Sequence, residues 1–439
     1  MLTRRDFIRA GAGLGIGAVT IPLLDACSGL AGGGGGSSSG GTTIEAAWWG
    51  GSDRAKRTQE VIKLFEKKNA KDKITASFSD IDPYFQKLNT EAAGGGLPDI
   101  IQLGGGYVPQ YMHKGQLLDL TKYTDNGTID VGDYDKGQLA QGQVDGKLYA
   151  VSNGGNMPSI IYNKTMIKKA GMPLPPADLT WESFATYVRQ LREKLPKSAW
   201  PIDDASDGGA GDAFGVWVRQ RRPESYTKDG KIAFTLADVQ QWFAYWAGLR
   251  KANLITPGDV VAAEIQNTAA DAAPIVQGKA AFTFAWSNFL GQYQILTKDE
   301  LGMMRCPSGG KQAGDYVQAS QFFSISSKSK APDVAAKFIQ FFEHDPAALK
   351  ILGVERGVPA SAKARGILKP SLKPYDALQV QFLTDNIAKC RAKTQLDPSN
   401  SAAVGEALQR ASQSIALSHV SVAAAATKFM GDAEKALES

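Results

Sequence analysis

Over residues 43–103, the hydrophobic positions follow the spacing of a strand and the spacing of a helix in turn. A helix is expected over residues 55–68, because four residues share one face at helical spacing: Thr58, Val61, Ile62 and Phe65. Strands are expected on either side, at 43–49 (TIEAAWW) and 73–79 (KITASFS). A helix near 84–93 and a strand at 99–103 (DIIQL) repeat the pattern. Strand–helix–strand units of this kind build parallel sheets flanked by helices, so the pattern predicts an α/β fold.

After residue 103, expected strands and helices alternate less regularly. Further strands are expected at four places: 145–151, 159–163, 280–286 and 316–326. The first two are joined through 153–156 (NGGN), a segment suited to a connection between domains, and the last is long enough to lead the chain back to the first domain. Helices are expected at five places: after the capping residue Thr180, around Trp242, from Pro332, from Pro346 and from Ser401.

The first 26 residues are organised like an export signal. The Arg4-Arg5 pair resembles a twin-arginine motif, and residues 23–27 (LLDAC) resemble a lipobox, whose cysteine becomes the acylated first residue. The apolar stretch 10–24 is shorter than the roughly 20 residues of a membrane-spanning helix. It also contains helix-weakening glycines. We therefore expect a lipid anchor rather than a transmembrane anchor.

This reading divides the N-terminal region into two parts. Residues 1–26 form the signal, and residues 27–42 comprise the lipidated Cys27 and a Gly/Ser-rich linker. A Gly/Ser-rich segment buries little apolar surface and has high backbone entropy, so it behaves as a flexible coil. Folding is therefore expected to start near Thr42.

Composition limits the classes of protein that need consideration. The mature chain, about 400 residues long, exceeds what one hydrophobic core supports, so two domains are expected. Its 43% hydrophobic and 21% charged residues are ordinary for a globular protein. The net charge of +5 is not concentrated in a basic stripe beyond Arg219–Arg222. A nucleic-acid partner is therefore not expected.

Motifs for metal and nucleotide chemistry are missing from the sequence. It has no His-Glu-x-x-His, Cys-x-x-Cys or phosphate-binding Gly-x-x-x-x-Gly-Lys motif, and its three histidines stand alone. We therefore expect no metal and no cofactor. Besides Cys27, the chain has Cys306 and Cys390; the sequence leaves open whether they pair in an oxidising compartment.

Residues that follow the expected strands suggest a binding site. In open parallel sheets, ligands bind beyond the carboxyl ends of the strands. There the chain has Trp48 and Trp49, then Asp80, then the glycine-rich segment 104–107. An aromatic ring suits the C–H face of a sugar, and a carboxylate suits its hydroxyls, so a carbohydrate cleft is expected. Two alternatives stay open: one of the tryptophans belongs to the core, and Asp80 serves a helix cap or turn.

Several segments resemble the successive signatures of extracellular solute-binding proteins of carbohydrate ABC importers. They are WWGGSDRAKRTQEVIKLFEKKN, LPDIIQLGGGYVPQYMHKGQLLDL, IIYNKTMIKKAGMPLPPADLTWESF, GKAAFTFAW and APDVAAKFIQFF followed by GVP. The resemblance covers nearly all of the mature chain, and the YNK…AGMPLPP…TW block is its most specific part.

The resemblance implies a two-lobed α/β clamp of the periplasmic-binding-protein type, with the ligand cleft between lobes joined by hinge segments. Lobe 1 is then 43–153 plus 319–365, and lobe 2 is 154–318 plus 366–439. The implied protein is not an enzyme: it captures a mono- or oligosaccharide and delivers it to the transmembrane subunits of an ABC permease. We further expect a monomer outside the cytoplasm, held to the cell membrane only by a lipid such as palmitate.

Matching the segments to that family also implies ligand-binding positions. They are Trp48, Trp49, Asp80, Gly105, Tyr107, Asn153, Asn156, Trp217, Trp286, Asn288, Gln318, Gln321, Arg356 and Gly357.

Two other functions compete with this reading. A lipid-anchored glycoside hydrolase needs two carboxylates about 5–10 Å apart across a sugar bond. Asp80 with Asp203 or Asp204 are the candidates, although no spacing rule connects them. An adhesion or structural lipoprotein predicts repeats or a flat aromatic surface, and the sequence has neither. A binding protein without a chemical step is therefore the preferred hypothesis.

Overall fold

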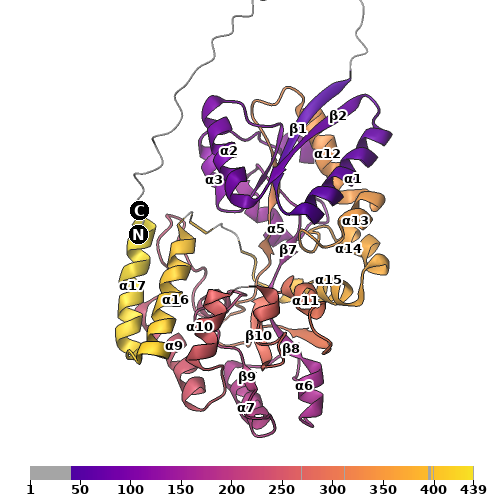
Figure 1. Cartoon of the computed structure of the whole chain (residues 1–439). Helices are drawn as coiled ribbons and strands as arrows, with labels where there is room; N and C mark the ends of the chain where they lie inside the picture. Colours follow the sequence, from indigo (N-terminus) through magenta and orange to yellow (C-terminus); the bar gives the residue numbers. More distant parts are fainter. Residues whose placement is uncertain (1–40, 268, 311, 394–396, 399, 439) are drawn as a thin grey trace, which may run out of the picture. The chain divides into compact units, whose positions relative to one another are not determined.

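Two β-sheets organise the computed structural model, which describes residues 41–438 except 268, 311, 394–396 and 399 (Figure 1). The first sheet has the strand order β2-β1-β3-β13-β6 and the second the order β11-β8-β10-β9. The predicted signal and the lipidation at Cys27 lie outside the described residues, as does the linker except for its last two residues.

The first sheet confirms the strands expected early in the chain. Its members are β1 (Thr42–Trp49), β2 (Asp72–Ser79), β3 (Ile100–Leu103), β6 (Val151–Ser152) and β13 (Phe322–Ile325). β1 runs parallel to β2 and β3, whereas β13 is antiparallel to β3 and β6. The βαβ pattern predicted from the sequence is thus present, with a late strand added to the sheet.

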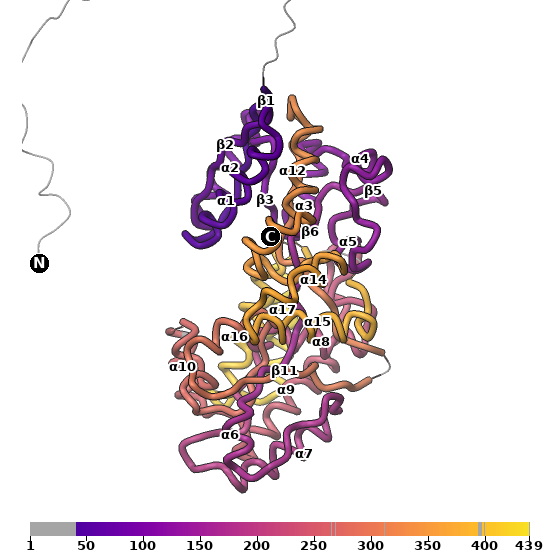
Figure 2. Tube along the Cα trace, turned by 90° about the vertical axis from the view of Figure 1, so that its right-hand side faces the viewer, coloured from indigo at the N-terminus to yellow at the C-terminus, as the bar shows by residue number. Residues whose placement is uncertain are grey.

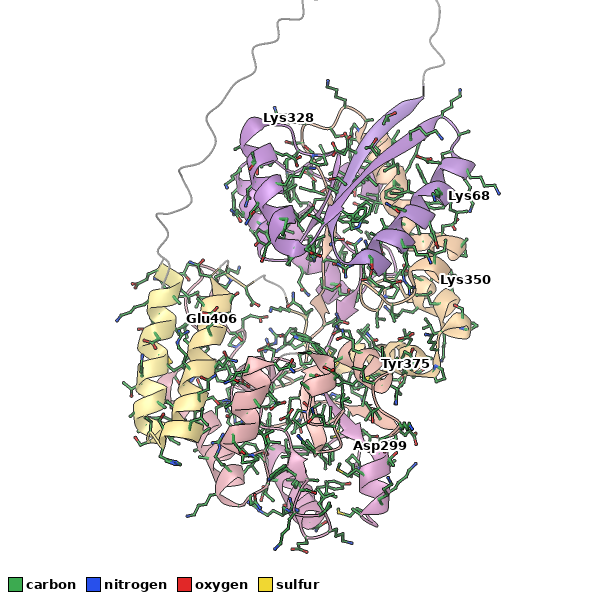
Figure 3. All side chains as sticks on the ribbon, viewed as in Figure 1. Lys68, Asp299, Lys328, Lys350, Tyr375 and Glu406 are labelled. Atoms are coloured by element: carbon green, nitrogen blue, oxygen red, sulfur yellow. The ribbon has the colours of Figure 1, made fainter. Side chains whose placement is uncertain are left out.

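Helices cover both faces of the first sheet. One face is covered by α1 (Ser52–Lys68), α12 (Pro332–His344) and α13 (Pro346–Leu352), the other by α2 (Ile81–Gly94) and α3 (Tyr107–His113). Figure 2 shows α12 beside this sheet although it comes far later in the sequence. Lys68 and Lys350 project from α1 and α13, which contact each other (Figure 3).

The second sheet also mixes parallel and antiparallel strands. It contains β8 (Pro158–Asn163), β9 (Trp200–Ile202), β10 (Ala280–Trp286) and β11 (Leu301–Met304). β10 pairs parallel with β9 and antiparallel with β8. The helices of this part are α6 (Lys164–Lys169), α7 (Trp181–Arg192), α8 (Ala213–Arg219), α9 (Leu236–Lys251), α10 (Gly258–Gln266), α11 (Phe289–Gln294), α16 (Ser401–Ser418) and α17 (Val422–Glu438).

Aromatic side chains dominate the core beside the second sheet. Trp181 of α7 lies edge-on to Trp217 of α8 and Trp242 of α9, at centroid distances of 5.2 and 5.9 Å. Thr180 caps α7 as expected, and Ser183 completes a capping box. Each buried aromatic side chain removes a large apolar area from water, which stabilises this core.

Two short strands pair where the chain passes between the sheets. β7 (Gly155–Asn156) pairs antiparallel with β12 (Gln318–Ala319). The single strand predicted over 316–326 is therefore wrong, because the chain breaks between β12 and β13. At the break, the backbone N–H of Ser320 donates to the Gly154 carbonyl over 2.9 Å instead of joining either sheet.

The strand predicted at 145–151 is also divided. β5 (Lys147–Leu148) forms a hairpin with β4 (Gln143–Val144), and only β6 joins the first sheet. Between β5 and β6, the N–H groups of Tyr149 and Ala150 both donate to the Gly142 carbonyl, so the chain turns there. The remaining helices are α4 (Thr121–Asp125), α5 (Lys136–Gln141), α14 (Ala362–Leu368) and α15 (Pro374–Asn386).

Cys306 and Cys390 are free thiols in the structure, which answers the question of pairing that the sequence left open. Burial raises the pKa of Cys390 to about 12 and that of Cys306 well above its ordinary value. Throughout the described ranges, no helix has both the length and the apolar character that crossing a membrane requires.

Candidate ligand-binding cavity

A cavity of about 480 Å³ lies beyond the carboxyl ends of β9 and β10. Its volume is within the range of about 300–1,000 Å³ that is usual for small-molecule sites. Its aromatic, charged and amide lining includes Asp207, Asp212, Arg219, Glu224, Trp286, Tyr316, Gln318, Lys393 and Asp397. The cavity thus combines aromatic rings with charged and amide groups.

Trp286, the last residue of β10, supplies an aromatic wall of the cavity. Its backbone N–H donates to the Ala210 carbonyl over 3.1 Å, which fixes the strand end against the segment that follows β9. The Tyr316 ring meets the indole edge to face, with centroids 5.9 Å apart. The indole is only partly buried. Its remaining surface is available to a ligand in the cavity.

Asp212 and Tyr316 form a buried polar pair at the start of α8. Asp212 adopts a left-handed conformation with φ of 53° and caps the helix by accepting a hydrogen bond from the Gly215 N–H. Its carboxylate also accepts a hydrogen bond from the Tyr316 hydroxyl. Burial raises the pKa of the Asp212 carboxyl, although the Tyr316 hydrogen bond opposes the shift. The pair therefore holds a carboxylate and a phenol in fixed positions on the cavity wall.

Two cations complete the polar lining, and both are already bonded. Lys393 donates to Gln318 Oε1 over 2.9 Å and to Asp397 Oδ2 over 2.8 Å. Arg219 pairs with Glu224 and donates to the carbonyl of Gly314. Burial lowers the pKa of Arg219 to about 10, so the guanidinium keeps its charge at neutral pH.

These groups suit recognition of a polyhydroxyl compound. An indole face offers an apolar surface to C–H bonds, and carboxylates accept hydrogen bonds from hydroxyl groups. Amide and ammonium groups add donors. Within the described ranges, no group of three or more His, Cys, Asp or Glu side chains is arranged to hold a metal ion.

Trp286 and Gln318 are the two residues from the predicted site that line this cavity. Asp207, Asp212 and Tyr316 were missed. The two carboxylates follow β9, a three-residue strand with too few positions to show a hydrophobic period. Tyr316 lies two residues before Gln318, and this proximity to the second crossing was the available signal.

Two predicted tryptophans lie in the core instead of a cleft, which corrects the prediction. Trp48 is 0% exposed and stacks on Phe78, with centroids 5.7 Å apart. It points to the α1 side of the sheet, because successive side chains of a strand alternate between faces. Trp217 is 5% exposed among core aromatics, and its indole N–H donates to the Asp238 carbonyl. Neither ring is available to a ligand in this structure.

Four other predicted residues lie at the carboxyl ends of the first sheet: Trp49, Asp80, Gly105 and Tyr107. Trp49 is half-buried and its ring contacts that of Phe85. The Tyr107 ring stacks on the same Phe85, with centroids 4.0 Å apart. Asp80 is exposed and occupies the N-cap position of α2, yet its side chain makes no capping hydrogen bond. The cap role considered for Asp80 is therefore not observed.

The loop that contains Gly105 approaches the cavity. A methyl group at Gly106 would lie 4.0 Å from the backbone oxygen of Asp397, a cavity residue. The 104–107 loop therefore comes close to Asp397 at Gly106.

A third set of predicted residues surrounds the two crossings: Asn153, Asn156, Gln321, Arg356 and Gly357. Asn153 donates to Glu343 Oε1 over 2.8 Å, and Gln321 accepts a hydrogen bond from Arg54. Arg356 is buried, donates to Thr58 and lies over the Phe342 ring. The side chains of Asn153, Gln321 and Arg356 are therefore engaged with other residues of the protein at the crossings.

Asn156 at the first crossing and Asn288 beside α11 have different surroundings. Asn156 belongs to β7 and accepts a hydrogen bond from Gln379 over 3.4 Å. Asn288 precedes α11 at the N-cap position, is half-buried, and makes no side-chain cap bond. Neither residue lines the 480 Å³ cavity.

Glu343 predicts a pH dependence of folding. Burial raises the pKa of its carboxyl from 4.5 to about 8, although the Asn153 hydrogen bond opposes the shift. Between those pH values the folded chain keeps a proton that the unfolded chain releases, so this group stabilises at low pH and its contribution is lost as pH rises. Glu343→Gln keeps an acceptor for Asn153. The wild-type free energy of unfolding should fall by more than about 1 kcal/mol relative to the variant between pH 5 and 8.

Urea unfolding of both proteins at several pH values measures this difference. A constant difference from pH 5 to 8 would show that Glu343 titrates normally.

Comparison with known proteins adds independent information on the fold. Residues 60–371 match the family model described as "Bacterial extracellular solute-binding protein". The chain is 24% identical to the "Multiple sugar-binding protein" of Streptococcus mutans serotype c over 354 residues, which are 74% of this chain and 76% of that protein.

Solved structures resemble this chain over most of its length. An extracellular solute-binding protein of family 1 from Alicyclobacillus acidocaldarius is 28% identical, with a TM-score of 0.80 over 91% of this chain and 99% of that one. A periplasmic oligogalacturonide binding protein from Yersinia enterocolitica, in complex with saturated digalacturonic acid, is 22% identical. Its TM-score is 0.72 over 90% of this chain and 99% of that one. The second likeness shows the shared fold alone.

Proposed function

Because the chain belongs to the bacterial extracellular solute-binding protein family, we propose that it captures a carbohydrate in the 480 Å³ cavity and delivers it to an ABC permease. The proposal rests above all on the lining of that cavity, where the partly exposed Trp286 ring lies beside fixed acceptors and donors. Similarity to a protein named as a multiple sugar-binding protein supports the substrate class. The protein then performs no chemical step of its own.

Closure of two lobes around the sugar is the proposed signal to the transporter. Lobe 1 comprises 43–153 and 319–365, and lobe 2 comprises 154–318 and 366–439. The distribution of strands supports these limits, since the first sheet uses residues 42–152 and 322–325 and the second uses 158–304. Hinge closure of this kind shifts the population of conformers when the ligand binds the closed state more tightly.

Trp49, Asp80 and the 104–107 loop are proposed to contribute the lobe 1 side of the site. Two observations support this role. Asp80 is exposed and its carboxylate is not used by the α2 cap, and the loop runs close to Asp397. A ligand held by Trp286 and Gln318 would then meet acceptors from the other lobe on closure.

A lipid on Cys27 is proposed to hold the protein at the outer face of the cell membrane. The support is the lipobox-like sequence LLDAC after an apolar stretch and before a Gly/Ser-rich segment. Cys27→Ser should release the protein from the membrane fraction and leave its unfolding midpoint unchanged. Retention of the variant after salt and carbonate washing would contradict the anchor.

The hydrolase alternative gains no support from the predicted carboxylates. The carboxyl group of Asp203 is used in hydrogen bonds with Thr256, Thr283 and Glu264. Asp204 is used in an ion pair with Arg250. Binding therefore remains the proposed function.

Calorimetry against a library of neutral and acidic oligosaccharides tests the proposal, together with an assay for new reducing ends. Saturable binding of a sugar that is recovered intact is the expected result. Release of reducing ends would favour the hydrolase, and absence of binding throughout the library would contradict a carbohydrate ligand.

A further inference from the structure

The cavity is lined by more carboxylates than cations. Among its described lining residues, four are acidic and two are basic: Asp207, Asp212, Glu224 and Asp397 against Arg219 and Lys393. Each cation is matched by one carboxylate, since Arg219 pairs with Glu224 and Lys393 with Asp397. Neither Asp207 nor Asp212 forms an ion pair with these cations, although Asp212 is near enough to Lys393 for its charge to oppose the rise in pKa that burial causes. The lining therefore keeps an excess of carboxylates.

The hydrogen bonds to the carboxylates of Asp207 and Asp212 come from uncharged donors. Asp207 Oδ1 accepts a hydrogen bond from the Gly209 N–H over 2.9 Å. Asp212 accepts from the Gly215 N–H and from the Tyr316 hydroxyl. Burial raises the pKa of Asp207 to about 6. Its carboxyl is therefore ionised at pH 7.5 and keeps the cavity negative.

A second cavity lies beside the first. It has a volume of about 340 Å³ and shares Asp207 and Gly209 with the first cavity. Asp203, Asp204 and Glu264 also line it, and its described lining includes no Lys, Arg or His. The two cavities therefore adjoin at Asp207. The second adds little negative charge, because Asp204 is paired with Arg250 and the carboxyl groups of Asp203 and Glu264 share a hydrogen bond.

We infer that the site takes uncharged saccharides and excludes sugar acids such as uronates. This inference rests on the proposed function. Hydroxyl groups of a neutral sugar donate hydrogen bonds to the carboxylates of Asp207 and Asp212, which are acceptors when ionised. A uronate brings a carboxylate into a partly buried site where it meets like charge. Arg219 and Lys393 offer it little compensation, because each is already paired with a carboxylate of the lining.

Pairs of saccharides that differ in one group at C6 test this inference. Galactobiose is compared with digalacturonate, and cellobiose with its C6-oxidised form, by calorimetry at pH 7.5 in 0.15 M salt. Within a pair that binds, the neutral member should bind at least about 100-fold more tightly. Equal or tighter binding of the acidic member would overturn the inference and leave the proposed function standing. If every neutral and acidic saccharide of a wider library fails to bind, both are contradicted.

An amide at Asp207 provides the second arm of the test. Asp207→Asn keeps an oxygen that can accept the Gly209 hydrogen bond and removes one negative charge from the cavity. The neutral-to-acidic affinity ratio should fall at least about 10-fold. Glu60→Gln makes the same charge change at an exposed position of α1 and should leave the ratio unchanged. An unchanged ratio in Asp207→Asn, with a native unfolding midpoint, would overturn the inference.

Discussion

Trp286→Ala should weaken sugar binding by roughly 1–3 kcal/mol, taking the stacking of aromatic side chains on nucleic-acid bases as the guide. This corresponds to roughly 5- to 150-fold in the dissociation constant. The reason is that the variant removes an aromatic surface that lines the cavity and is only partly buried in the protein. Calorimetric affinity and the urea midpoint, measured on the same sample, separate binding from folding. Trp286→Phe keeps an aromatic surface and should recover part of the affinity.

Trp217→Phe is the matched control for this prediction. Trp217 lies in the aromatic core and donates to the Asp238 carbonyl, so the variant should lose stability and keep the affinity of the folded fraction. The opposite pattern would contradict both assignments: native affinity with a large midpoint loss in Trp286→Ala, and weakened binding in Trp217→Phe.

Gly154→Ala should destabilise the protein by about 3 kcal/mol or more, because the chain leaves no room for a side chain at the first crossing. Gly154 has φ of 152°, which residues with a Cβ rarely adopt, and such strain alone costs about 1–3 kcal/mol. A Cβ there would also lie 2.9 Å from the Arg356 carbonyl oxygen and from the Gly357 carbon. These are backbone atoms, so relief requires movement of the crossing segments.

Gly248→Ala serves as the control for Gly154. Gly248 lies within α9, and a Cβ at that position has no neighbouring atom within 4 Å. Alanine is the better helix former, so this variant should gain about 0.5–1 kcal/mol. Urea unfolding curves of the two variants measure the contrast. A Gly154→Ala protein as stable as the wild type would show that the crossing segments tolerate more change than their contacts indicate.

Sequence reasoning recovered the elements whose hydrophobic period is long enough to read. The helix predicted over 55–68 is the main part of α1, and the capping role of Thr180 is confirmed. The strand expected at 316–326 was misread because its apolar positions continue through a break. That break depends on a hydrogen bond between Ser320 and Gly154, which are far apart in the sequence and leave no periodic signal.

The cavity was harder to predict because its polar members come from distant segments. Trp286 follows from the strand-end rule, since β10 is an unbroken apolar strand. Lys393 and Asp397 come from a part of the sequence with no regular period, and only tertiary contacts bring Lys393 to Gln318. The prediction that Trp48 lines the cleft was wrong for a different reason. The alternation of a strand assigns two adjacent tryptophans to opposite faces but does not say which face is open.

A crystal structure of the protein with its tightest-binding oligosaccharide would show where the sugar is held. We expect a sugar ring in the 480 Å³ cavity, with one face against Trp286 and hydroxyl groups within hydrogen-bond distance of Asp207 or Asp212. A sugar bound elsewhere, with this cavity unchanged, would contradict the proposed function.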